Sequence, residues 1–66
     1  MTEQVIYCKV GTWPALRLPV VRKRKAPIVG DTFEVRNLEN PGDVTRVQCY
    51  EIKDLGGQLL YMLERW

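Results

Sequence analysis

The sequence predicts an all-β fold, either a small five-stranded SH3-like barrel or a half-open sandwich. Three observations indicate this class. Apolar and polar residues alternate along most of the chain, turn residues recur at short intervals, and 66 residues supply only one small core. We therefore interpret residues 1–66 as a single small β domain. An OB-like closure fits this length less well.

The first two strands are expected at Val5–Val10 and Ala15–Arg22, separated by the turn sequence "GTWP". In the first strand every second residue is apolar, which predicts one inward face with Ile6, Cys8 and Val10. The second strand contains Pro19, which has no backbone N–H to donate to a ladder. This strand is therefore predicted to lie at an edge or to carry a bulge.

The third strand is expected to begin at Asp31, after a turn bracketed by Pro27 and Gly30, with Phe33 and Val35 inward. The tetrapeptide "NPGD", residues 40–43, then matches a type II turn, in which proline takes the second position and glycine the third.

The fourth run, Val44–Ile52, alternates only in part. Val47 and Cys49 share one face, whereas Tyr50 and Ile52 continue the apolar series on the other. A shift of one residue is typical of a β-bulge or a strong bend, which a small closed sheet needs.

The final run, "QLLYMLERW", follows the glycine turn "DLGG" and has two interpretations. A glycine turn directly after a strand favours a hairpin partner, which is the interpretation we prefer. The alternative is a short helix, because four apolar residues fit a helical stripe: Leu59, Met62, Leu63 and Trp66.

The composition excludes much of enzyme chemistry, because the chain contains neither histidine nor serine. Nucleophile–histidine triads, histidine metal ligands and imidazole acid–base catalysis are therefore absent. Cys8 and Cys49 cannot complete a tetrahedral zinc site alone and are expected to be buried thiols. The sequence predicts a protein that is not an enzyme, with no catalytic residue, metal site or cofactor.

The start "MTEQVIYCKV" has no basic or apolar region of the kind that a signal peptide carries, and no apolar run approaches about 20 residues. The sequence therefore predicts a cytoplasmic protein without a membrane partner.

Positive charge is unevenly distributed along the chain, although the net charge is only +2. Nine consecutive residues hold half of the ten cationic side chains and no acid: Arg17, Arg22, Lys23, Arg24 and Lys25. Such a segment predicts contact with an anionic partner, either nucleic acid, which we favour, or an acidic protein surface. The alternative is a solvated loop whose charges keep a strand edge soluble.

Further residues are expected to extend this basic surface. Lys9 and Arg17 share the outward phase of their strands, so they would flank the loop when the first two strands pair. An exposed Trp13 or Tyr7 would add an aromatic platform on which bases stack.

A second candidate surface lies at the end of the sequence. Tyr61, Met62, Leu63 and Trp66 supply more apolar material than one face of a small barrel can bury. If the last strand is an edge, the surplus predicts a homodimer or a partner interface. The alternative is that Trp66 folds back over the mouth of the barrel.

The segments "LPVV", "APIVGDTFEV" and "VTRVQCYEI" resemble short uncharacterised all-β proteins of bacteria and bacteriophages, which share a Pro-x-x-Gly-Asp turn that leads into a strand. The basic residues before Pro27 depart from that pattern. "VGDTFEV" also looks a little like the strand entry of a KOW motif. The resemblance to the all-β proteins implies a small accessory binding protein and carries over no catalytic residue.

Overall fold

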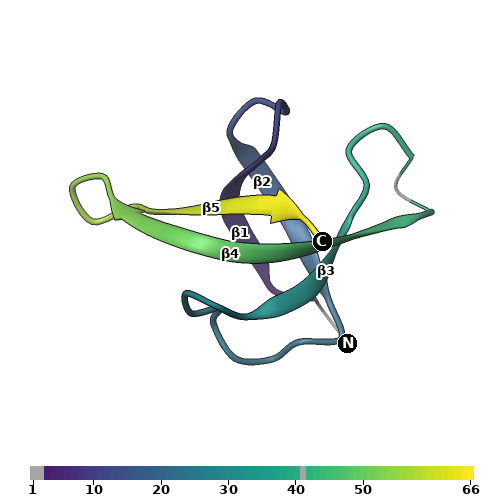
Figure 1. The fold of residues 1–66 in the computed structure, drawn as a ribbon, viewed down its shortest axis with the longest axis horizontal. Coiled ribbons are helices and arrows are strands. Elements are labelled where there is room, and N and C mark those ends of the chain that lie inside the picture. The colour runs from purple at the N-terminus through teal and green to yellow at the C-terminus, as the bar shows by residue number, and fades with distance from the viewer. Residues whose placement is uncertain (1–2, 41) are drawn as a thin grey trace.

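The computed structural model describes residues 3–40 and 42–66, and this part of the chain is all-β with no helix (Figure 1). The strands are β1 (Val5–Val10), β2 (Leu16–Val21), β3 (Thr32–Arg36), β4 (Val44–Asp54) and β5 (Leu59–Arg65). The five predicted strands are thus confirmed, and the last segment is a strand rather than a helix. The described residues include no helix long and apolar enough to cross a membrane.

The strands form one ring-like sheet in the order β1-β2-β3-β4-β5. Each strand pairs antiparallel with the next, so β1 and β5 run in the same direction and close the ring in parallel. At this closure Cys8 lies opposite Tyr61 and Val10 lies opposite Leu63. The N–H of Gly11 donates to the carbonyl oxygen of Leu63 at 3.1 Å and extends the closure by one residue.

β2 lies between β1 and β3, so the prediction that it is an edge strand is wrong. Leu16–Pro19 lie along β1, whereas Val20 and Val21 lie opposite β3. The N–H of Val20 donates to Gln4 at 2.8 Å, on the β1 side. Because successive residues direct their backbone groups to opposite sides, the nitrogen of Pro19 faces the β3 side just before that pairing begins. A proline is tolerated there because no ladder donor is needed.

The predicted irregularity in β4 is confirmed. Cys49 lies opposite Leu63 and Glu51 lies opposite Met62, so Tyr50 is an extra residue in the ladder with β5. A bulge of this kind bends a strand and changes which residues face inward. With this bend, residues 44–48 of β4 pair with β3, and residues 47–54 pair with β5 (Figure 1).

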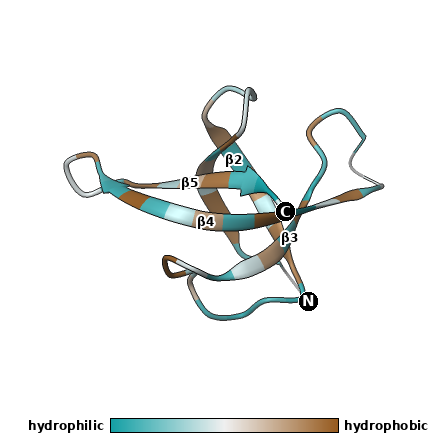
Figure 2. Ribbon diagram, viewed as in Figure 1, coloured by the Kyte–Doolittle hydropathy of each residue, from teal (hydrophilic) through white to brown (hydrophobic). Residues whose placement is uncertain are grey.

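The core fills the inside of the ring, and the alternating colours along the strands in Figure 2 reflect the two faces. Every strand contributes to it, and its members are Ile6, Cys8, Val10, Trp13, Leu18, Val20, Phe33, Val35, Val47, Cys49, Tyr61 and Leu63. The inward faces predicted for the first and third strands are therefore confirmed. This shared core holds the ends of β2, β3 and β4 in fixed relative positions.

Trp13 belongs to this core, which corrects the expectation that its indole is exposed. Its side chain is only 8% exposed, although it lies in the connection between β1 and β2 rather than in a strand. The N–H of Trp13 donates to Val10 at 2.9 Å and turns the chain back over the ring. The guanidinium carbon of Arg65 lies 5.2 Å from the ring centroid, within the range of a cation–π contact.

Cys8 and Cys49 are free, fully buried thiols, as predicted. Burial raises the pKa of Cys8 to about 11 and also raises the pKa of Cys49. Because the thiolate is the reactive form, both side chains behave as small apolar groups at neutral pH.

Candidate anion-binding surface

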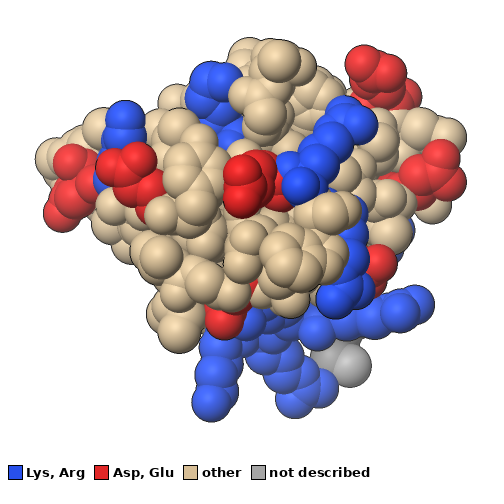
Figure 3. Space-filling model, viewed as in Figure 1, with Lys and Arg blue, Asp and Glu red and all other residues tan. Residues whose placement is uncertain are grey.

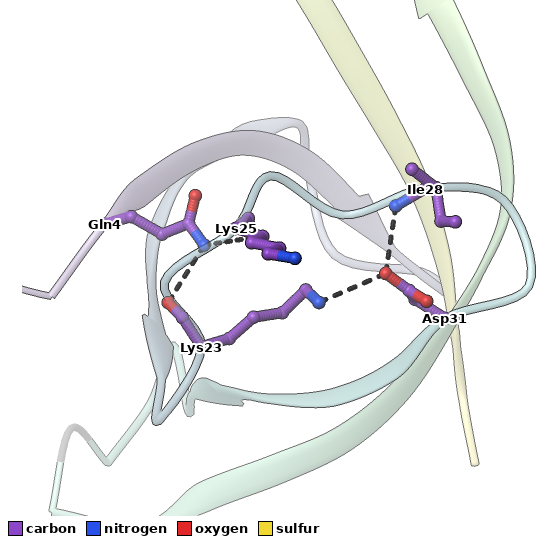
Figure 4. Close-up of polar contacts among 5 residues, drawn as sticks. All are labelled: Gln4, Lys23, Lys25, Ile28 and Asp31. Atoms are coloured by element: carbon purple, nitrogen blue, oxygen red, sulfur yellow. Dashed lines mark hydrogen bonds and ion pairs between the residues drawn. The ribbon is translucent and has the colours of Figure 1, made fainter.

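The basic segment, residues 22–25, begins where β2 ends. Arg22 has a φ of 57°, a left-handed conformation that is uncommon for residues other than glycine. The side-chain amide of Gln4 donates to the carbonyl oxygens of Lys23 and Lys25, at 3.0 and 2.7 Å (Figure 4). Gln4 therefore fixes the path of the segment from the residues that precede β1.

The end of the connection is held by the Pro-x-x-Gly-Asp turn. The N–H of Asp31 donates to Ile28 at 3.0 Å, and Gly30 takes the positive φ of 97° that this turn requires. The Asp31 carboxylate accepts a hydrogen bond from the N–H of Ile28 and forms a salt bridge with Lys23 Nζ, both at 3.1 Å (Figure 4). One carboxylate thus joins the turn to the basic segment.

This arrangement makes the anchoring of the segment dependent on pH. The Ile28 N–H, and then Lys23, hold the pKa of Asp31 below its ordinary value of 3.8. A lowered pKa means that the ionised carboxylate stabilises the folded state above the ordinary value, and that this stabilisation is lost as the pH falls through the folded pKa.

We therefore expect Asp31→Asn to destabilise the protein by a constant amount above about pH 5, with the difference from the wild type shrinking below about pH 4. Urea unfolding of both proteins across this range measures the difference. A difference that stays the same down to pH 2 would show that the Asp31 charge does not anchor the segment.

The structure places the four predicted cations of residues 22–25 at one end of the ring. Arg22, Arg24 and Lys25 are exposed, and Lys23 is half-buried against Asp31. Figure 3 shows Lys and Arg side chains projecting together from its lower edge, where the connection between β2 and β3 runs in Figure 1.

Lys9 and Arg17 do not flank this segment, although β1 and β2 pair as predicted. The antiparallel pairing puts the end of β2 beside the start of β1, whereas Lys9 and Arg17 lie toward the other end. Arg17 is five residues before Arg22, which corresponds to about 16 Å along a strand. The Lys9 ammonium donates to Gly11 at 2.7 Å, and Arg17 contacts Gln58 at 3.5 Å.

An open pocket lies beside the basic segment, and sequence reasoning missed one of its cations. Its lining residues come from β2, β3, β4 and the segment: Val21, Arg22, Lys23, Thr32, Phe33, Glu34 and Arg46. Arg46 enters because it pairs with Glu34 across β3 and β4, and Glu34 pairs with Val21 across β2 and β3. Two separate parts of the sequence thus supply cations to one surface.

The register that brings Arg46 here depends on a wide turn. The Asp43 N–H donates to Asn40 at 2.9 Å, so the chain turns where "NPGD" predicted, although Pro41 lies outside the described residues and the turn type is not assigned. If the ladder between β3 and β4 continued up to Asn40 and Asp43, Glu34 would lie opposite Cys49 rather than opposite Arg46. Instead, the side chain of Asn37 accepts hydrogen bonds from the N–H groups of residues 39 and 40, and the ladder ends earlier.

The second candidate surface, at the C-terminal strand, exposes fewer apolar side chains than the sequence predicted. β5 is paired on both sides, so it is not an edge strand, and Tyr61 is buried in the core. Met62 is half-buried. Trp66 is 67% exposed and does not fold back over the ring, and its N–H donates to the carbonyl oxygen of Arg46 at 2.9 Å.

Comparison of the chain with protein-family models, curated proteins and solved structures finds no match. Within residues 3–40 and 42–66, no three side chains of the metal-binding types gather. The functional inference therefore depends on the charge and shape of the surface.

Proposed function

We propose that this protein is a non-enzymatic binding module, a small SH3-like barrel that contacts an anionic partner. The contact surface is the cationic end, which comprises Arg22, Lys23, Arg24, Lys25 and Arg46. The observation that carries the proposal is that Arg22, Lys23 and Arg46 line a single pocket although they come from different parts of the chain.

Nucleic acid is the favoured partner because its phosphates match a cluster of guanidinium and ammonium groups. Each cation that meets a phosphate releases condensed counterions, so several neighbouring cations make binding strong and dependent on salt. The backbone of the segment is already held by Gln4, and Asp31 holds the side chain of Lys23. A preformed surface loses less conformational entropy on binding than a flexible loop.

The proposal places the protein in the cytoplasm, where free thiols such as those of Cys8 and Cys49 are the usual state. We also propose kinship with the short all-β proteins of bacteria and bacteriophages on the residues of the Pro27–Asp31 turn, and that kinship would imply an accessory binding role.

The direct test compares two variants that each remove three cations. One is Arg22→Ala/Lys25→Ala/Arg46→Ala, in the cationic end. The matched control is Lys9→Ala/Arg17→Ala/Lys53→Ala, elsewhere on the ring. In fluorescence anisotropy with a labelled 12-nucleotide DNA, we expect the first to weaken binding about 100-fold and the second less than about threefold.

Circular dichroism checks that both variants are folded. Equal losses in the two variants would mean that net charge alone governs binding. Unchanged binding in the first variant would contradict the proposal.

The alternative function is protein interaction or homodimerisation through the C-terminal residues, which the exposure of Trp66 favours. Light scattering separates the two functions. A tight dimer that dissociates on Trp66→Ala would support the alternative, whereas a monomer that binds oligonucleotides would support the cationic end.

A further inference from the structure

Trp66, the residue that follows β5, lies at the end of a row of residues that crosses β2, β3 and β4 and passes through the pocket. Val21 pairs with Glu34, Glu34 pairs with Arg46, and the Trp66 N–H bonds to Arg46. Side chains directly opposite one another on neighbouring strands lie about 5 Å apart at their Cβ atoms. The row therefore joins an aromatic side chain to the cations of the pocket.

Three members of this row, Glu34, Arg46 and Trp66, face outward, whereas Val21 is buried. Phe33 and Val47, which precede Glu34 and follow Arg46, are in the core, and strand neighbours point to opposite faces. On β5 the buried residues are Tyr61 and Leu63, so the even-numbered positions point away from the core. The Trp66 N–H bond to Arg46 continues the register of the β4–β5 ladder by one residue, and residues opposite one another in a ladder share a face, so we place the indole of Trp66 on the outer face beside Arg46.

Trp66 is the most exposed of the large apolar side chains in the described part of the chain, at 67%. An exposed aromatic ring beside a cationic pocket is the combination by which proteins bind single-stranded nucleic acid. The cations follow the backbone, and the ring stacks on a base with about 1–3 kcal/mol per base.

A duplex does not offer this second contact, because its bases stack on one another and show only their edges in the grooves. Glu34, the acidic residue in the pocket lining, also favours a single strand over a duplex. The Glu34 carboxylate repels a phosphate placed directly over it, and it can accept a hydrogen bond from the amino group of an unpaired base.

We infer that the partner of the cationic end is single-stranded rather than duplex nucleic acid, and that one of its bases stacks on Trp66. The phosphates on either side of that base contact Arg46 and the basic segment. This inference rests on the proposed function and names its partner class. It also assigns to Trp66 the aromatic role that the sequence analysis gave to Trp13 or Tyr7.

The test measures the affinity of a 12-nucleotide mixed-sequence DNA as a single strand and as a duplex with its complement. We expect Trp66→Ala to weaken binding of the single strand about tenfold or more and to change binding of the duplex less than about twofold. Trp66→Phe is expected to retain most of the affinity, because phenylalanine also stacks. The matched control is Tyr50→Ala, which removes an exposed aromatic ring at the bulge.

Tryptophan fluorescence gives a second readout that does not depend on affinity. The chain has two tryptophans, and Trp13 is buried. We expect the single strand to quench the emission of the wild type and to leave the emission of Trp66→Phe, which reports only Trp13, nearly unchanged.

The outcomes separate the inference from the proposed function. If duplex binds as tightly as single strand and Trp66→Ala weakens neither, the inference is wrong while the cationic end remains the binding surface. If neither form of DNA binds the wild type, or if the cationic-end variant binds both as the wild type does, the proposed function is wrong as well.

Discussion

Trp13→Ala is expected to lower the free energy of unfolding by about 3–5 kcal/mol, the usual effect of truncating a large aromatic residue in a core. The indole is 8% exposed, packs in the core cluster and lies under the guanidinium of Arg65. Removing it leaves a cavity that a small ring of strands cannot fill by relaxation. Because a core of this size rarely supplies more than about 3–5 kcal/mol of net stability, much of the Trp13→Ala protein should be unfolded even without denaturant, which circular dichroism of both proteins across a urea titration measures.

Trp66→Ala is the matched control, because it makes the same chemical change at a residue that is 67% exposed. Its unfolding free energy should stay within about 0.5 kcal/mol of the wild type, as for most surface substitutions. Such a pair of results would assign Trp13 to stability and leave Trp66 available for the binding role proposed above. A loss below 1 kcal/mol for Trp13→Ala would show that Trp13 does not form part of the core.

Leu63→Ala is expected to cost about 2–5 kcal/mol. Leu63 is 1% exposed and lies between Cys49 of β4 and Val10 of β1, at the parallel closure of the ring. A core of this size rarely supplies more than about 3–5 kcal/mol of net stability. We therefore expect much of the Leu63→Ala protein to be unfolded at 25 °C, with weakened near-ultraviolet circular dichroism.

Leu59→Ala provides the control on the same strand, at a position that is 42% exposed and opposite Asp54 beside the hairpin turn. Its cost should be below about 1 kcal/mol, because less apolar surface is returned to water. Similar losses at the two positions would contradict the packing described for the closure.

Much of the fold follows from local patterns in the sequence. The alternation of apolar and polar residues predicted the strands. The change of phase between Cys49 and Ile52 predicted the bulge, which lies at Tyr50. The glycine turn after β4 predicted the hairpin, in which the Asp54 carboxylate accepts the Gly57 N–H at 2.8 Å. These features depend on neighbours in the chain, so a sequence contains their signals directly.

Local patterns do not predict which residues lie opposite one another on paired strands, nor whether a single residue in a connection is buried. Arg46 joins the pocket because the hydrogen bonds of Asn37 widen a turn by several residues. Trp13 is one residue in a connection and carries no periodic signal, so its burial was missed. Lys9 and Arg17 share the outward phase of their strands, but phase alone does not say which end of a strand pair a residue occupies.

In the function proposed here, the ring holds the cationic end in one arrangement and this end contacts phosphates. Gln4, Asp31 and the pairing of β3 with β4 fix its parts in place. The scaffold therefore contributes geometry, while the basic segment and Arg46 contribute the charge.

A salt titration of DNA binding measures how many phosphates the cationic end contacts. The logarithm of the association constant for single-stranded DNA should fall linearly with the logarithm of the salt concentration, with a slope of about −0.7 for each phosphate that is neutralised. Loss of Arg22, Lys25 and Arg46 should make that slope about 2 units less steep, whereas loss of Lys9, Arg17 and Lys53 should leave it nearly unchanged. A flat dependence in the wild type, or equal slopes in the wild type and the cationic-end variant, would show that the cationic end does not contact phosphates.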